Sequence, residues 1–236
     1  MTTRLIEVAP ERLERWLAGF GGRHDGASVQ TDGAVVVSAT GGDGCVARVE
    51  HFAHDPLGII LIRRGGYAVG LASATADAGA PRRSRPAAPG LGELSPREGA
   101  KSTGPGAMRL VTSKVGTRHV QSRTAAGGWS QQRFARRRGN QADALVDAVT
   151  GHAVQILLGG NESPGTGAAG IPRGLVVGGD RALVAQVLED AALRSVAGVP
   201  KRELYDLPDP RRAVLEDALR RGRAIRIELA DGTVEH

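Results

Sequence analysis

The segment IILIRRGGYAVGLA, from Ile59 to Ala72, predicts the architecture of the larger part of the chain. Two apolar runs of strand length, Ile59–Arg64 and Tyr67–Ala72, flank Gly65-Gly66, and two glycines between such runs are typical of a β-hairpin. Further along the chain, short apolar runs alternate with segments of helical periodicity. This order predicts an α/β (α+β) fold, in which a mixed sheet is flanked by helices.

The elements expected before and after the hairpin follow from the same patterns. A strand at Leu5–Val8, a helix from Pro10 to about Phe20 and strands at Ala34–Ala39 and Cys45–Phe52 predict a small N-terminal α/β module. After the hairpin we expect strands at Met108–Val115, Arg118–Ser122, Ala153–Leu158, Leu175–Val177 and Ala224–Leu229, and helices at about Arg133–Val149, Arg181–Asp190 and Asp209–Arg221. Gly178-Gly179-Asp180 is interpreted as a turn in which the aspartate caps the following helix.

Two domains are therefore expected, with residues 1–56 as the small module and residues 57–236 as the larger domain. Residues 76–106 differ in composition, because five prolines stand there among Ala, Gly, Ser and Arg with few residues to bury. We interpret this stretch as a flexible insertion in the larger domain.

The charge balance favours a partner that carries phosphate. Lys and Arg total 31 against 25 Asp and Glu, which gives a net charge of +6, and Lys101, Lys114 and Lys201 are the only lysines. Arginine matches phosphate geometry better than lysine does, so RNA or DNA is the first partner class to consider. A genome-wide preference for Arg, Ala and Gly codons is the alternative explanation.

Several classes of protein are excluded. Cys45 is the only cysteine, which leaves no disulfide framework and no cysteine-based zinc site. The N-terminal sequence MTTRLIEVAPERLERW is charged and lacks the apolar core of a signal peptide. The longest apolar runs are of strand length, far too short to cross a bilayer. We expect a soluble cytoplasmic protein with no membrane partner.

The segment RTAAGGWSQQRFARRRGNQ, from Arg123 to Gln141, carries the strongest functional signal. Gly127 and Gly128 allow an unusual backbone path and expose amide groups, and Trp129 follows in what should be a loop. A ring of that size in a loop either fills a core or stacks on a base. The neutral side chains that come next, Ser130, Gln131 and Gln132, donate and accept hydrogen bonds without titrating near pH 7.

The helix that follows is expected to have two distinct faces. Ala142, Leu145, Val146 and Val149 recur at the spacing of a buried stripe. A cluster of arginines occupies the first turns, where they repel one another and oppose the helix dipole unless phosphate neutralises them. A solvated basic face is the alternative interpretation. The residues expected to contact RNA are Arg123, Arg133, Arg136, Arg137 and Arg138.

No other pattern indicates a catalytic or metal site. His51, His54 and Asp55 do not have the arrangement of metal ligands, because a spacing of three on a strand directs two side chains to opposite faces. The sequence also lacks a Gly-x-Ser-x-Gly motif and the spaced carboxylates of a two-metal nuclease. We expect neither a metal nor a cofactor.

The segments IRRGGYAVGLA and KVGTRHVQSRTAAGGWSQQRFARRRGNQ resemble the actinobacterial Vms-like (VLRF-type) release factors. These are peptidyl-tRNA hydrolases related to the catalytic domain of the eukaryotic and archaeal class I release factors. The resemblance extends from about residue 57 to the C-terminus. It implies an RNase H-like catalytic domain, a mixed sheet flanked by helices, which agrees with the order of elements expected above.

The resemblance also implies a mechanism. In release factors a Gly-Gly-Gln loop enters the peptidyl-transferase centre, and its glutamine helps water to attack the ester that joins peptide to tRNA. Vms-like relatives carry Gly-Ser-Gln, and the counterpart here is Gly127, Gly128, Ser130 and Gln131, with Trp129 as an added residue. Gln131 is the expected catalytic residue because it follows Ser130 directly, and Gln132 is the alternative.

The expected function is the release of nascent chains from peptidyl-tRNA on stalled large ribosomal subunits, with ribosomal RNA and peptidyl-tRNA as partners and the protein as a monomer. One alternative is cleavage of the tRNA near its 3′ end. Another is a non-catalytic RNA-binding factor, for which Gln131→Ala would leave activity unchanged while Arg136→Ala and Arg137→Ala would abolish it. A third is an ordinary globular protein in which Trp129 is buried.

Overall fold

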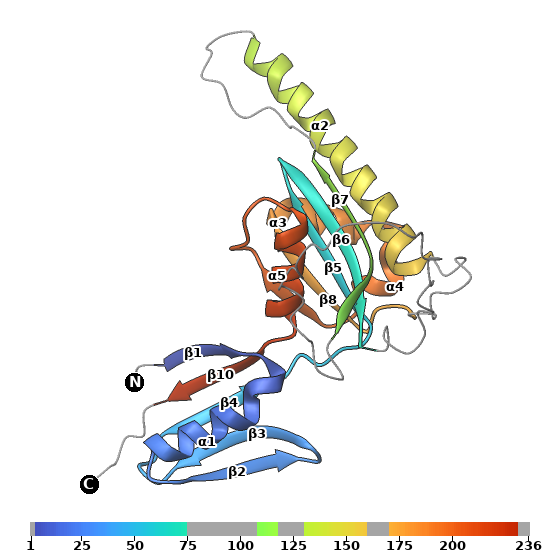
Figure 1. Ribbon diagram of the computed structural model, residues 1–236. Helices are drawn as coiled ribbons and strands as arrows, with labels where there is room; N and C mark the ends of the chain where they lie inside the picture. The colour runs from blue at the N-terminus through green and yellow to red at the C-terminus, as the bar shows by residue number, and fades with distance from the viewer. Residues whose placement is uncertain (1–2, 75–107, 118–129, 160–169, 231–236) are drawn as a thin grey trace, which may run out of the picture.

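A computed structural model describes residues 3–74, 108–117, 130–159 and 170–230, with the backbone alone described from 130 to 138. The insertion expected at 76–106 and the strand expected at Arg118–Ser122 lie outside the described residues. The described part contains two five-stranded sheets and the helices that pack on them (Figure 1). The α/β fold class expected from the sequence is confirmed.

The second sheet forms the centre of the larger half of the molecule. Its strands are ordered β7-β6-β5-β8-β9, and β5 runs antiparallel to β6 but parallel to β8. Their bounds are β5 (Leu57–Arg63), β6 (Gly66–Ser73), β7 (Arg109–Thr117), β8 (Gly174–Gly179) and β9 (Lys201–Leu204). Every residue of β5 before Arg63 is buried, as is typical of a central strand covered on both faces. The hairpin predicted around Gly65-Gly66 is confirmed.

Helices cover both faces of this sheet. Alternate side chains of β5 point to opposite faces, so Ile60 and Ile62 belong to one core whereas Ile59 and Leu61 belong to the other. The first core is closed by α2 (Ser130–Ala153), α3 (Arg181–Glu189) and the short helices η4 (Ala191–Leu193) and α4 (Arg194–Ala197). The second is closed by α5 (Arg212–Gly222). The result is a helix–sheet–helix arrangement of three layers.

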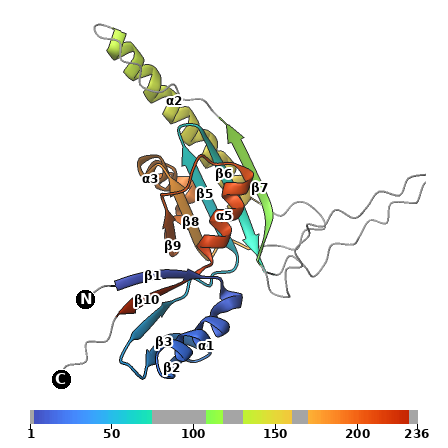
Figure 2. The ribbon, with the colours of Figure 1, turned by 60° about the vertical axis from the view of Figure 1, so that its left-hand side comes forward.

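The first sheet is antiparallel throughout, in the order β1-β10-β4-β3-β2. Its strands are β1 (Thr3–Val8), β2 (Ala27–Asp32), β3 (Val35–Gly41), β4 (Val46–Glu50) and β10 (Ile225–Ala230), and one face packs on α1 (Leu13–Arg23), which follows the 3₁₀ turn η1 (Pro10–Arg12). The C-terminal strand β10 thus lies between two strands of the N-terminal segment, at the lower end of the molecule in Figures 1 and 2. The expected division of the chain at residue 56 stays a prediction, but the first sheet draws one strand from beyond it.

The strand predicted at Ala153–Leu158 is wrong. Helix α2 extends to Ala153 and continues as the π-helical turn η3 (Val154–Leu158), in which Leu157 packs against the sheet. The apolar run reflects burial, and a short apolar run alone does not separate a buried strand from a buried helical turn. Strands β2 and β9 were not predicted. All six residues of β2 are exposed, so no alternating pattern marks that strand.

Arg202 on β9 joins the two sheets. Its side chain is 1% exposed and donates to Glu50 Oε1 on β4 at 3.0 Å and to the carbonyl oxygen of Ala224, just before β10. The guanidinium also lies over the ring of Phe52, 4.9 Å from its centroid. Burial and the nearby Arg226 lower the pKa of Arg202, and Glu50 opposes that shift. One buried cation therefore contacts both parts of the molecule.

We predict that Arg202→Ala lowers the free energy of unfolding by about 2–4 kcal/mol, because it removes charge-assisted hydrogen bonds and leaves a cavity. Urea unfolding of the full chain measures this effect. Arg194→Ala is the matched control, since Arg194 is an exposed arginine for which a change within about 0.5 kcal/mol is expected. Equal stability of the two variants would contradict the role given to Arg202.

Candidate active site

The candidate residues lie in or directly before the first turns of α2. Gly127, Gly128 and Trp129, together with Arg123, fall outside the described residues. The backbone of the other candidates is helical, and these are Ser130, Gln131, Gln132, Arg133, Arg136, Arg137 and Arg138. Both glutamines, Gln131 and Gln132, therefore lie in the first turn of α2.

Helix α2 begins at Ser130, earlier than predicted. The sequence indicated a loop through Gln132 and a helix from about Arg133, and that boundary is wrong. Gln, Arg and Ala are good helix formers, so the helix begins directly after Trp129. The first-turn amides of a helix have no acceptor within the helix and lie at the positive end of its dipole. With no acidic residue in that turn, the start of α2 favours an anionic or oxyanionic partner.

Most of the N-terminal half of α2 lies beyond the sheet. Both ribbon views show the helix extending past the ends of the strands, with its first turns at the far tip (Figures 1 and 2). The first fully buried side chain described in it is that of Leu145, and Gly139 and Asn140 are exposed. At about 1.5 Å per residue, Ser130 is roughly 22 Å along the helix from Leu145. We call residues 130–141 the arm of α2.

The arginine positions and the buried stripe lie on different sides of α2. Leu145, Val149 and Ala153 are fully buried and face the sheet. At about 100° per residue, positions 133, 136 and 137 fall roughly opposite that stripe. Position 138 falls nearer the stripe, but on the arm, where the sheet no longer covers the helix. The predicted buried stripe is confirmed, and the RNA-contacting role of the arginines stays a prediction.

Tyr67 fixes the place where the candidate segment leaves the sheet. Its buried ring stacks on His152 of α2, with 5.4 Å between centroids and an interplanar angle of 22°. The same ring packs over Gly116 on β7, so closely that a Cβ there would lie 2.4 Å from Tyr67 Cζ. Thr117, the last residue of β7, pairs with Gly66. Residues 118–129 thus connect β7 to α2, and the Tyr67 ring contacts both of these elements. The position of Tyr67 in an apolar strand did not predict this role.

Charged side chains of both signs gather at the end of the sheet from which residues 118–129 depart. Arg63 ends β5 and donates to the carbonyl oxygen of Tyr205 at 3.4 Å. Arg181 lies over the Tyr205 ring, 4.1 Å from its centroid, and 3.7 Å from Glu203. Burial raises the pKa of Tyr205, Glu203 acts in the same direction, and Arg181 opposes it. Exposed Arg64 adds a further positive charge beside them.

The turn after β8 caps a helix. Asp180 Oδ1 accepts from the backbone N–H of Ala182 at 3.0 Å and of Leu183 at 3.4 Å, at the start of α3. Gly179 has φ +103°, and its Cα lies so close to Ile62 that a Cβ would meet the carbonyl oxygen of Ile62. The predicted aspartate cap is confirmed, since the Asp180 carboxylate accepts hydrogen bonds from the first backbone amides of α3.

Across the described ranges, no group of three or more His, Cys, Asp or Glu side chains gathers that could hold a metal ion. His51, considered from the sequence, hydrogen-bonds through Nε2 with the carbonyl oxygen of Val36 at 2.8 Å. His54 packs edge-on against Phe52.

The sequence matches the model of a known protein family. A model of the Actinobacteria/chloroflexi VLRF1 release factor family matches residues 97–228, more than half of the chain. The chain belongs to this family. The matched range contains every candidate residue from Arg123 to Arg138, and membership indicates a release-factor-like role in translation. No curated protein matches the chain.

None of the described helices has both the length and the apolar character that crossing a bilayer requires.

We predict that Gly116→Ala destabilises the larger domain by about 1–3 kcal/mol, because the added methyl group forces the Tyr67 ring off its stack on His152. Thermal unfolding followed by circular dichroism measures this effect. Gly151→Ala is the control, since nothing lies within 4 Å of a Cβ at that helical position and a gain of about 0.5–1 kcal/mol is expected. A Gly116→Ala protein as stable as wild type would show that Tyr67 is not held tightly.

Proposed function

We propose that this VLRF1-family protein is a peptidyl-tRNA hydrolase that releases nascent chains from stalled large ribosomal subunits in the cytoplasm. The observation that carries the proposal is the position of Ser130 and Gln131 in the first turn of the α2 arm, directly after Gly127-Gly128-Trp129, in a release factor family. A catalytic segment at the tip of a projecting helix is suited to a substrate bond that lies inside another large particle.

The proposed chemistry needs no strong base. The ester between peptide and tRNA is activated, so the rate of its hydrolysis depends mainly on holding a water molecule in line with the carbonyl carbon. The neutral amide of Gln131 is proposed to orient that water. The first-turn backbone amides of α2 are proposed to stabilise the negative charge that develops on the carbonyl oxygen. The water adds to the carbonyl carbon, the bond to the tRNA ribose oxygen breaks, and that oxygen takes up a proton.

The arginines of the arm are proposed to hold it against RNA. Arg133, Arg136 and Arg137 occupy positions roughly opposite the buried stripe. Arg138 follows on the side nearer that stripe, and Arg123 precedes the loop. Guanidinium groups bind phosphate well, and several of them along a helix supply affinity without base specificity. We propose that the partners are ribosomal RNA of the large subunit and peptidyl-tRNA, and that the protein acts as a monomer.

The topology of the second sheet supports the proposal that the part of residues 57–236 that forms this sheet and its helices is an RNase H-like release-factor catalytic domain, although β10 (Ile225–Ala230) joins the first sheet. Three consecutive antiparallel strands, β5, β6 and β7, are followed by two parallel strands, β8 and β9, on the other side of β5. Helices on both faces complete the arrangement that the resemblance implied.

The proposal predicts that Gln131→Ala slows peptide release about 10²-fold or more, because the attacking water is no longer held in position. The assay uses large subunits that carry labelled peptidyl-tRNA and resolves peptidyl-tRNA, free peptide and tRNA on a gel. Gln155→Ala is the control, because Gln155 is exposed at the opposite end of the same helical segment. Loss of release in Gln132→Ala alone would shift the catalytic position by one residue. Undiminished release by both variants would contradict the mechanism.

The same assay identifies the bond that breaks. Ester hydrolysis leaves a tRNA with an intact 3′ end that can be charged again, whereas cleavage near the 3′ end leaves a shortened tRNA and a peptide that carries nucleotides. We expect rechargeable tRNA from the wild-type protein. A shortened tRNA would replace the hydrolase by an endonuclease acting on the same complex.

We predict that the double variant Arg136→Ala/Arg137→Ala binds large subunits more weakly and with a lower salt dependence. In a plot of the logarithm of the binding constant against the logarithm of the salt concentration, the slope should become shallower by about one unit for each phosphate that the variant no longer binds. Sedimentation of labelled protein with subunits at several salt concentrations measures both quantities. Arg173→Ala/Arg194→Ala removes two exposed arginines elsewhere and should bind like wild type. An unchanged slope for the arm variant would show that these arginines do not contact RNA.

A further inference from the structure

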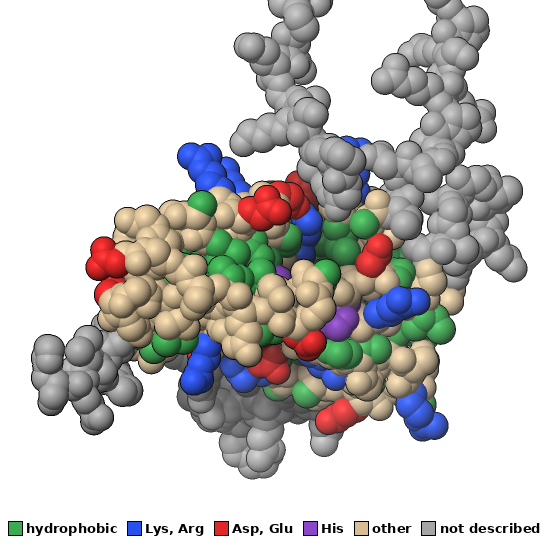
Figure 3. Space-filling view, turned by 90° about the horizontal axis from the view of Figure 1, so that it is seen from below, with side chains coloured by type: hydrophobic (Ala, Val, Ile, Leu, Met, Phe, Trp, Pro, Cys, Tyr) green, Lys and Arg blue, Asp and Glu red, His purple; other side chains and the backbone are tan. Residues whose placement is uncertain are grey.

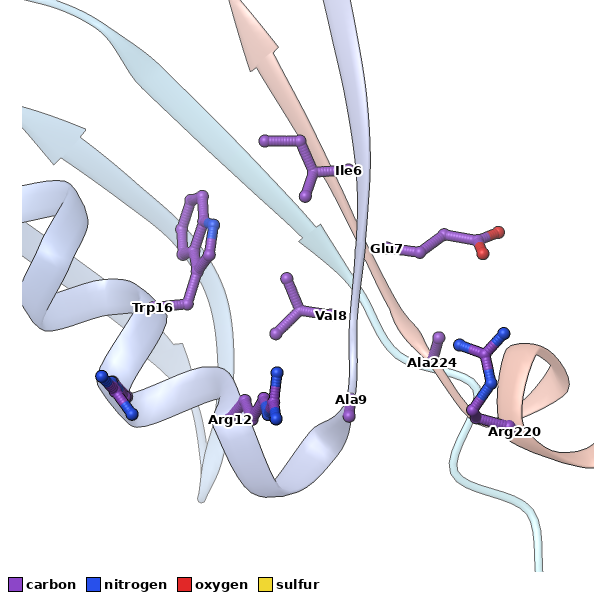
Figure 4. A pocket seen from close by; sticks show the side chains of 9 residues that line it. Ile6, Glu7, Val8, Ala9, Arg12, Trp16, Arg220 and Ala224 are labelled. Atoms are coloured by element: carbon purple, nitrogen blue, oxygen red, sulfur yellow. The ribbon is translucent and has the colours of Figure 1, made fainter. Parts of the chain in front are cut away.

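A groove of about 690 Å³ lies away from the α2 arm, where the end of β1 and the start of α1 approach the last turn of α5 (Figure 1). Its walls are β1, which contributes Ile6 and Val8, and the first turns of the α1 region, which contribute Arg12, Arg15 and Trp16 (Figure 4). Arg220, in the last turn of α5, also lines it, on the other side of β1 from Trp16 in Figure 4. The groove thus combines residues from both parts of the chain, and the release chemistry does not use it.

The groove has an excess of positive charge. Arg12 and Arg15 are exposed, and the side chain of neither forms an ion pair or hydrogen bond with any residue that the structure describes. The carboxylate that also lines the groove, Glu7, is neutralised by Arg221 at 3.5 Å and Arg226 at 3.7 Å. Elsewhere on this end of the molecule, side chains of both signs lie around the margin with apolar side chains between them (Figure 3). Two guanidinium groups without an ion-pair partner among the described residues, those of Arg12 and Arg15, therefore line the groove.

The groove also offers an apolar and aromatic wall. The indole of Trp16 is half-buried, and it stacks on Phe20 with 5.4 Å between centroids and an interplanar angle of 16°. Phe20 is fully buried, so it fixes the orientation of the Trp16 ring. Ile6 and Val8 face the indole across the groove in Figure 4. A flat ligand has an oriented ring and two aliphatic side chains to pack against.

We propose that this groove binds a nucleotide of RNA, with its base against Trp16 and its phosphate between Arg12 and Arg15. An aromatic ring beside cationic side chains is the combination that single-stranded nucleic acid requires, because bases stack on the ring and phosphates pair with the guanidinium groups. The volume of the groove falls in the range of ordinary ligand sites. That the RNA is ribosomal rests on the proposed function. The stacking of a base on Trp16 and the pairing of a phosphate with Arg12 and Arg15 do not depend on it.

The test uses the full chain with Trp129→Phe, which leaves Trp16 as the only tryptophan and makes its fluorescence a report on the groove. Titration with a 12-nucleotide single-stranded RNA should quench that fluorescence to saturation, and rising salt should weaken the binding. Arg15→Glu in the same background should weaken binding about tenfold or more. Arg23→Glu, the same charge reversal on α1 outside the groove, should leave the dissociation constant unchanged.

The proposal would be overturned if RNA did not quench the fluorescence of Trp16. It would also be overturned if Arg15→Glu and Arg23→Glu weakened RNA binding equally, or if an acidic peptide quenched the fluorescence as much as RNA does. Equal affinity for a mononucleotide such as AMP would also overturn it, since that result assigns the groove to a free nucleotide. Peptide release by the Arg15→Glu protein with Trp129 intact is measured separately. If the groove binds RNA but the protein releases no peptide, the groove proposal holds and the proposed function fails. If the protein releases peptide but the groove binds no RNA, the proposed function holds and the groove proposal fails.

Discussion

The packing of Leu145, Val149 and Ala153 against the second sheet is the contact that gives the candidate site its position. These residues hold only the second half of α2, so the first turns are carried beyond the sheet by the stiffness of the helix itself. Tyr67 adds a second constraint, because its ring lies between His152 of the helix and Gly116 of β7. Residues 118–129 thus begin and end at elements that are fixed to one core.

The centre of the second sheet was predictable, because β5, β6 and β8 are short apolar runs and the β5–β6 hairpin has two glycines at the turn, whereas β9 has the charged sequence Lys-Arg-Glu-Leu and was not predicted. The buried stripe of α2 was predictable for the same reason, since its spacing has the helical period. The π-helical turn at Val154–Leu158 was not, because burial on one side of a helix gives the same short apolar run as a strand. The place of β10 in the first sheet depends on pairing between distant segments, which local patterns do not encode. The candidate glutamines were found from their motif, whereas the length of the arm became evident only in the structure.

The two parts of the molecule are joined through charged side chains. Arg202 is buried between the sheets, and Arg221 of α5 bonds both Asp206, at 2.8 Å, and Glu7 of β1. These contacts fix the half of the molecule that carries the arm relative to the half that carries Trp16 and its groove. If both ends contact RNA as proposed, the separation between them is set by the fold, and the protein has two points by which it is oriented on a large particle.

The most direct measurement lengthens the arm. Inserting Glu-Ala-Ala-Ala-Lys-Ala-Ala between Gly139 and Asn140 adds about two helical turns, roughly 10 Å, and turns the arginine face by only about 20°. The proposed mechanism predicts folded protein that still binds large subunits but releases peptide at least about 100-fold more slowly, because the glutamine no longer reaches the ester. The same insertion at the exposed β2–β3 turn, beside Gly33, should leave release unchanged. Release at the wild-type rate by the lengthened protein would contradict the proposal that the arm positions the catalytic glutamine.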